Sequence, residues 1–195
     1  MAYIEENAPA ALERAMEGIS RIATIVGAMK EFAHPDLRDK NPADLNKALQ
    51  TTLTISRNEY KLIADVRTDL ADIPPVTCHI GEINQVFLNL IVNAAHAIAA
   101  AQAGNGKRGL IRIRTRHDGS SVRVEIEDTG CGIPVDIRDR IFDPFFTTKP
   151  VGQGTGQGLA IARSVVVEKH GGLLTCESQV GVGTTFTVLL PVTPP

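Results

Sequence analysis

Two side-chain amides stand one helical turn apart in the most apolar long stretch of the chain. Asn89 and Asn93 lie within residues 79–101, HIGEINQVFLNLIVNAAHAIAAA. Residues four apart share one face of a helix, and burying an amide without a hydrogen-bond partner costs about 1–3 kcal/mol. The pair therefore predicts a polar ligand or a polar network at this helix. The alternative is isolated asparagines bonded to the backbone.

A carboxylate followed by glycines forms the second chemical feature. Asp128 opens the segment 128-DTGCGIP-134, in which Gly130 and Gly132 allow a flat ligand to approach the backbone closely. A carboxylate at this point can accept a hydrogen bond from an amino group. An ordinary Asx turn explains the same residues when they are taken alone.

Glycines recur in two later segments. Residues 152–158, GQGTGQG, precede a predicted helix, and backbone N–H groups at a helix N-terminus bind phosphate. Residues 181–186, GVGTTF, add a hydroxyl at the start of a strand. A flexible linker and a hairpin turn are the respective alternatives. Between these motifs, 142-FDPFFTTK-149 is either part of the core or the base of a flap.

The elements that must position these residues follow from hydrophobic periodicity. Residues 9–33 predict one long helix with a coiled-coil seam, which needs a partner helix or packs on its own domain. Pro35 ends it, and a second helix is predicted with Asn41 as its cap and Pro42 in its first turn. Further helices are expected at 79–101, 134–140 and 158–169. Strands are expected at 60–70, 110–118, 121–128, 173–178 and 184–191.

This order predicts an α+β fold, a two-layer sandwich of a mixed, mostly antiparallel sheet with helices on one face, preceded by the long N-terminal helix. The net charge of −2 gives no case for nucleic acid or an anionic membrane. The three cysteines are far apart and form no CxxC pair, so the sequence predicts neither a disulfide framework nor a zinc site. No apolar run is expected to span a membrane. We expect a cytoplasmic protein, or the cytoplasmic part of a larger membrane-anchored one.

Five motifs in a fixed order resemble the boxes of sensor histidine kinases, which belong to the GHKL ATP-binding superfamily. They are NLxxNA at 89–94, DTGxGI at 128–133, FxPFFTTK at 142–149, GTGxGL at 154–159 and GxGTxF at 181–186. The resemblance implies a Bergerat-fold ATP-binding domain over residues 35–195. It also implies that residues 1–34 hold part of the dimerisation and histidine-phosphotransfer hairpin.

The resemblance implies a role for each matching residue. Asp128 is expected to bind the adenine amino group, with Thr184 nearby, and Asn93 is expected to ligate Mg²⁺. Asn89 and Lys149 are expected near the phosphates as the catalytic groups, and residues 143–156 are expected to form an ATP lid. The other expected nucleotide contacts are Gly130, Gly132, Ile133, Phe142, Phe145, Phe146, Gly154, Thr155, Gly156, Gly158 and Leu159, with the three phenylalanines anchoring the lid.

Two departures bear on the reaction. ATP-hydrolysing relatives such as gyrase place a glutamate base where this chain has Asn89, and an amide cannot take a proton from water. The phosphoacceptor histidine of the kinases precedes Glu or Asp, and none of His34, His79, His96, His117 and His170 does. We interpret His34, His79, His117 and His170 as surface or capping residues. We therefore expect a catalytic piece of a kinase that cannot phosphorylate itself.

The leading hypothesis is the ATP-binding catalytic region of a bacterial sensor histidine kinase. Its cofactors would be ATP and Mg²⁺, and its partner the receiver domain of a response regulator. A homodimer through the N-terminal helix is expected, weakened if its partner helix is missing. The alternatives are a nucleotide-binding scaffold without kinase activity and, less favoured, a serine kinase of the anti-sigma-factor type.

Overall fold

The computed structural model describes residues 39–102, 107–148 and 156–193. Five strands form one sheet in the order β2-β4-β5-β7-β6, with β2 and β4 parallel and the other pairs antiparallel. The strands are β2 (Ala64–Leu70), β4 (Gly109–Asp118), β5 (Ser121–Asp128), β6 (Leu173–Gln179) and β7 (Gly183–Pro191). The predicted mixed, mostly antiparallel sheet is confirmed. The predicted helix at 9–33 and the proposed 1–34 segment lie outside the described residues.

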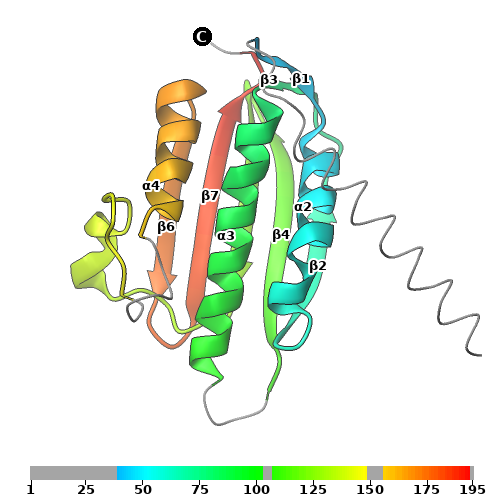
Figure 1. The fold of residues 1–195 in the computed structure, drawn as a ribbon. Helices are drawn as coiled ribbons and strands as arrows, with labels where there is room; N and C mark the ends of the chain where they lie inside the picture. Colours follow the sequence, from blue (N-terminus) through cyan, green and yellow to red (C-terminus); the bar gives the residue numbers. More distant parts are fainter. Residues whose placement is uncertain (1–38, 103–106, 149–155, 194–195) are drawn as a thin grey trace, which may run out of the picture.

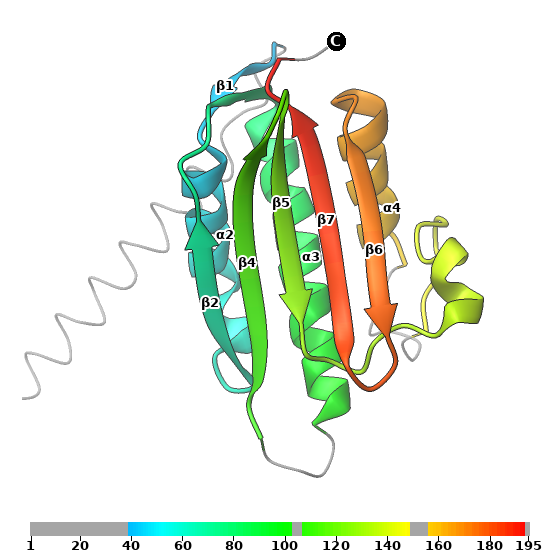
Figure 2. The same ribbon diagram turned by 180° about the vertical axis from the view of Figure 1, so that it is seen from behind.

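Three helical elements cover one face of this sheet, and the other face is open (Figures 1 and 2). They are α2 (Leu45–Tyr60), α3 (Ile80–Ala101), and α4 (Gly158–Arg163) with its π-helical continuation η2 (Ser164–Lys169). The 3-10 helix η1 (Val135–Arg140) lies in the segment that leaves the sheet beside β6 and α4. The core lies between the two layers, where Phe87 and Leu90 of α3 and Ile126 of β5 are fully or almost fully buried.

By length and composition alone, helix α3 is long and apolar enough to cross a membrane. The sequence did not predict any stretch of this kind. In this fold the helix packs along the sheet, and half of its most apolar window is buried. Its hydrophobicity is therefore accounted for by its central place in the core.

The boundaries near the start of the described region differ from those expected. Asn41 does not cap a helix, because Asn41–Ala43 form strand β1, which pairs with β3 (Val76–Cys78). The N-cap of α2 is Asp44, whose carboxylate accepts from the N–H of Lys47 at 3.1 Å. Helix α2 then runs through Tyr60, so the strand expected over 60–70 begins only at Ala64. A three-residue strand is too short to show a period of two, which is why β1 and β3 escaped detection.

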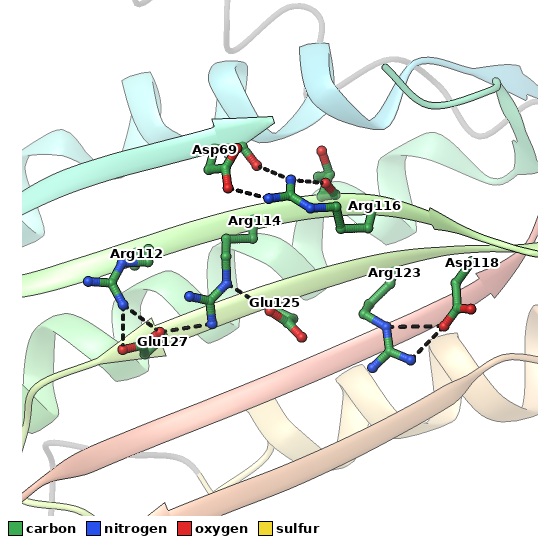
Figure 3. Close-up of polar contacts among 9 residues, drawn as sticks. Asp69, Arg112, Arg114, Arg116, Asp118, Arg123, Glu125 and Glu127 are labelled. Carbon is green, nitrogen blue, oxygen red and sulfur yellow. Dashed lines mark hydrogen bonds and ion pairs between the residues drawn. The ribbon is translucent and has the colours of Figure 1, made fainter. Parts of the chain in front are cut away.

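The open face of the sheet carries a ladder of ion pairs (Figure 3). Arg114 of β4 contacts Glu125 at 2.8 Å and Glu127 at 2.9 Å, both on β5. The other members of the ladder are Asp69, Arg112, Arg116, Asp118 and Arg123. These pairs are partly buried in the middle of the ladder and more exposed at its ends, and solvent-accessible pairs contribute about 0–1 kcal/mol each. The ladder therefore keeps this face solvated and adds little to stability compared with the core.

His170, interpreted from sequence as a surface or capping residue, is buried, with only 2% of its surface exposed. Its Nδ1 lies 2.7 Å from the carbonyl oxygen of Val165, and its Nε2 accepts the backbone N–H of His79 at 3.0 Å. These partners require the neutral ring with its proton on Nδ1. The ring thereby joins the end of η2 to the start of α3.

Protonation of His170 is expected to destabilise the domain. Burial lowers the pKa of His170 below its ordinary value of 6.5, so the unfolded chain takes up a proton more readily than the folded one. The stabilisation from the neutral ring is present above about pH 6.5 and is lost as the pH falls toward the lower folded-state pKa. His170→Gln should therefore lower the melting temperature more at about pH 7.5 than at about pH 5.5.

The measurement is thermal unfolding of both proteins at the two pH values. His117→Gln is the matched control, because His117 is exposed at the end of β4, and it should leave the melting temperature at the higher pH unchanged. An equal penalty for His170→Gln at both pH values would contradict the prediction.

Candidate functional site

Three polar side chains form a row across β5, β7 and β6 on the face of the sheet that the helices cover. Asp128 pairs in register with Thr184, and Thr184 pairs with Ser178. Directly paired residues bring their side chains next to each other on one face of a sheet. The next residues inward along these strands, Ile126 and Phe186, are apolar core. The row therefore marks the point where the inner face changes from core to a polar site.

Asp128 is the buried charge of this row, with 4% of its surface exposed. Its Oδ1 accepts the N–H of Gly130 at 2.7 Å. Desolvation raises the pKa of Asp128 to about 6, although hydrogen bonds from the backbone N–H groups of Gly130 and Thr184 oppose the shift. Above this pKa the carboxylate can only accept hydrogen bonds, which suits an amino group on a ligand.

The turn after Asp128 is held by elements on two sides. The N–H of Cys131 donates to the carbonyl of Ala97 on α3 at 3.1 Å, and the carbonyl of Cys131 accepts from Gly181 at 2.9 Å. A Cβ on Gly130 would lie 2.6 Å from the backbone of Ala97. One on Gly132, which has φ +71°, would lie 2.1 Å from the carbonyl oxygen of Gln179. Both glycines are thus required for this turn to sit between α3 and the β6–β7 hairpin.

Asn93 lies between two contacts that α3 makes with the site. One turn before it, the Asn89 amide donates to the carbonyl of Gly158 at the start of α4, at 3.0 Å. One turn after it, Ala97 contacts the turn at Gly130. Within the described residues the side chain of Asn93 has no hydrogen-bond partner and is half-buried. Its amide is therefore available to a ligand between the turn and α4.

The aromatic segment after η1 divides into two kinds of residue. Phe142 and Phe146 pack against the core, with Arg163 at 5.6 Å and Arg140 at 4.7 Å from their respective ring centres. Phe145 is 70% exposed, so its ring does not pack against the core as those of Phe142 and Phe146 do.

Backbone geometry explains why Phe145 points outward. It has φ +67°, and its N–H donates to the carbonyl of Gly156 at 2.9 Å. A Cβ on Gly156 would lie 2.4 Å from the carbonyl carbon of Phe145. The two ends of the predicted lid are thus joined through backbone at a position that only glycine fits. Lys149, Gly154 and Thr155 lie outside the described residues.

Two further predicted contacts flank the row. Ile133 is half-buried, and its N–H donates to the Ser178 hydroxyl at 2.7 Å. Leu159 is partly buried against the core at the start of α4, next to Gly158. The sequence did not identify Ser178 or Ala97 as site residues, because each contacts the site only where a distant segment of the chain packs against it.

The arrangement combines a hydrogen-bond acceptor in an apolar setting, a close-approach turn, a free amide and a glycine-rich helix start. These are features that nucleotide sites combine, and they lie where the sequence predicts the base, at Asp128, and the phosphates, near Asn89 and Gly158. In the part of the chain that the structure describes, no group of three or more His, Cys, Asp or Glu side chains could hold a metal ion. A cation here would depend on Asn93 and on the ligand's own oxygens, which suits Mg²⁺.

Comparisons with known proteins agree with this class of site. Residues 79–194 match the family of histidine kinase-, DNA gyrase B- and HSP90-like ATPases. The sensor histidine kinase ZraS of Escherichia coli K12 is 34% identical over 198 residues, covering 97% of this chain and 40% of ZraS. The catalytic domain of the histidine kinase ThkA superposes with a TM-score of 0.68 at 31% identity, covering 80% of this chain and 97% of that domain.

A second ThkA structure, in complex with the response regulator TrrA, matches with a TM-score of 0.64 at 27% identity, covering 92% of this chain and 49% of ThkA. The chain belongs to the histidine kinase-, DNA gyrase B- and HSP90-like ATPase family. Within that family it is an ATP-binding catalytic domain of the sensor histidine kinase type. It spans less than half of the length of ZraS.

Replacing Asp128 with Asn is expected to stabilise the domain and to weaken nucleotide binding. The folded-state pKa of about 6 lies above the ordinary value of 3.8, so this group stabilises the fold at low pH and the contribution is lost as the pH rises through 6. At about pH 7.5 the ionised carboxylate costs about 1–3 kcal/mol, and Asn removes that cost while keeping an acceptor for Gly130.

Thermal unfolding should show a higher melting temperature for Asp128→Asn at about pH 7.5 and a smaller gap at about pH 5. Calorimetric titration should show ATP affinity reduced at least about tenfold, because one acceptor oxygen becomes a donor. A variant that is less stable than wild type at the higher pH would show that the charge is better solvated than its burial indicates.

Proposed function

We propose that this domain binds Mg·ATP and donates the γ-phosphoryl group to a histidine side chain, as part of a sensor kinase. The observation that carries the proposal is Asn89. It occupies the position where ATP-hydrolysing relatives have a glutamate base, and its amide is bonded to the Gly158 carbonyl. An amide in this state cannot activate water.

Helix α3 carries no carboxylate close enough to Asn93 to act as the missing base. Glu82 lies eleven residues before Asn93, about 16 Å along the helix axis, and it is ion-paired with Lys169. Water attack on the γ-phosphate therefore lacks a base on this helix. A nucleophile that needs little activation, such as an imidazole nitrogen, fits the site better than water.

The proposed reaction uses the residues of the site for binding and positioning. Asp128 accepts the adenine amino group, and Asn93 supplies one oxygen to Mg²⁺, which neutralises phosphate charge when bound. The start of α4 at Gly158 and the lid between Phe145 and Gly156 enclose the β- and γ-phosphates. Lys149 provides a further cation in this proposal. Catalysis of in-line transfer then comes from alignment and charge neutralisation.

The acceptor histidine is proposed to lie outside the catalytic domain. His170 is buried and bonded on both ring nitrogens, so its ring is not available for phosphorylation. We propose that residues 9–33 belong to a dimerising hairpin of the whole kinase and that the phosphoryl group passes to a receiver domain. The ThkA–TrrA complex supports such a partner. The domain would work in the cytoplasm, alone or attached to a membrane-anchored part.

The test is calorimetric titration of the chain with a non-hydrolysable ATP analogue and Mg²⁺. Asp128→Ala should reduce affinity by about 100-fold or more, because the adenine amino group loses its partner. Asn93→Ala should remove the Mg²⁺ dependence of binding. Thr185→Val is the matched control, because Thr185 is the next residue after Thr184 and lies on the open face of the sheet. It should bind like wild type.

Transfer is then tested by mixing the chain with γ-labelled ATP and a separate sensor-kinase hairpin that carries an exposed His-Glu pair. Acid-labile label on the hairpin, absent with Asp128→Ala, is the expected result. Tight nucleotide binding without transfer to any supplied hairpin would favour a nucleotide-binding scaffold. A folded wild-type chain that binds no nucleotide would overturn the proposal.

A further inference from the structure

Ser178 is the centre of a hydrogen-bond network behind the buried carboxylate. Its hydroxyl oxygen lies 2.7 Å from the N–H of Ile133, 3.0 Å from the carbonyl oxygen of Gly183 and 2.9 Å from the hydroxyl oxygen of Thr184. The three partners come from the loop after β5 and from the first two residues of β7. Ser178 itself lies on β6, one place along the row from Thr184.

The protons of this network can be assigned by counting donors. A serine hydroxyl has one proton to donate and two lone pairs that accept. A carbonyl oxygen only accepts, so the Ser178 proton must go to Gly183. A backbone N–H only donates, so Ile133 uses one lone pair of Ser178. Thr184 must then donate its hydroxyl proton to the remaining lone pair.

This assignment decides what Thr184 offers to a ligand. With its single proton directed to Ser178, the Thr184 oxygen can only accept further hydrogen bonds. Its neighbour in the row, Asp128, is an acceptor whenever it is ionised. Asp128 on β5 and Thr184 on β7, which flank the proposed base site, therefore both present hydrogen-bond acceptors to a ligand.

We propose that Ser178 is a positioning residue that holds the Thr184 hydroxyl as an acceptor, and that the pocket thereby selects purines with a 6-amino group over those with a 6-oxo group. The inference rests on the proposed function, in which the base lies against Asp128. An amino group at position 6 supplies two donors to this pair of acceptors. A 6-oxo group places a third acceptor against them and leaves buried groups unpaired, which is the situation that gives polar pockets their selectivity.

The test compares Mg·ATP with Mg·ITP, which differ at position 6 of the base, by calorimetric titration at about pH 7.5, where Asp128 is ionised. We expect the wild-type chain to bind ATP about 100-fold more tightly than ITP. In Ser178→Ala the Thr184 proton is released and can be donated to a 6-oxo group. ATP should then bind about tenfold more weakly, ITP should bind as well as before or better, and the ratio should fall to about 10 or less.

Two further variants distinguish a role of Ser178 in orienting the Thr184 hydroxyl from a role in stabilising the fold. Ser178→Thr keeps the hydroxyl and should restore most of the ATP preference. Thr184→Val removes the acceptor itself and should weaken ATP binding while leaving ITP binding nearly unchanged, which keeps the test valid if Ser178→Ala fails to fold. Thr175→Ala is the control, because Thr175 is exposed on the same strand, and it should change neither affinity.

The outcomes distinguish this inference from the proposed function. Equal losses of ATP and ITP affinity in Ser178→Ala would assign the serine a purely structural role and overturn the inference, while the ATP-binding function would stand. A wild-type chain that binds both nucleotides equally would also overturn it. A folded wild-type chain that binds neither nucleotide would overturn the inference together with the proposed function.

Discussion

The burial of one carboxylate at the end of an apolar sheet face is the constraint on which the rest of the site depends. Asp128 follows Ile126 on β5 and has only 4% of its surface exposed. A charge in that position must be met by donors, and here the N–H groups of Gly130 and Thr184 meet it. The tight turn and the register of β5 with β7 place these two N–H groups at the carboxylate. The remaining acceptor capacity is what a ligand's amino group can use.

Helix α3 serves both the core and the site, and this dual role explains its unusual composition. Its buried face carries large apolar side chains such as Phe87 and Leu90. The amides Asn89 and Asn93 follow the edge of that face toward α4. Ala97 continues the edge to the turn at Gly130, where its small size permits backbone contact. The same helix edge therefore connects the start of α4 to the turn after Asp128.

The helix that begins at the site also reaches the opposite end of the domain. It starts at Gly158 beside Asn89 and ends, through η2, at His170, which bonds to the first residue before α3. The first end is thus tied to α3 by the Asn89 bond, and the second by the His170 bond and by the ion pair of Lys169 with Glu82 on α3. On the other side, Phe145 and Gly156, which flank most of the predicted lid, are joined by a backbone hydrogen bond. The π-helical turn η2 lies within this connection, and such turns are rare and frequently occur at functional sites.

Much of this protein is determined by local sequence. The amphipathic pattern of α3, the alternation in β4 and β5, and the five motifs in order were sufficient to predict the sheet, its helical layer and the family, because each depends on residues close together in the chain. Tertiary structure alone decided the parallel pairing of β2 with β4, the β1–β3 pair, the buried state of His170 and the place of Ser178 beside Thr184. Each of these depends on the register between distant segments, and a shift of one residue would turn Ser178 to the open face of the sheet.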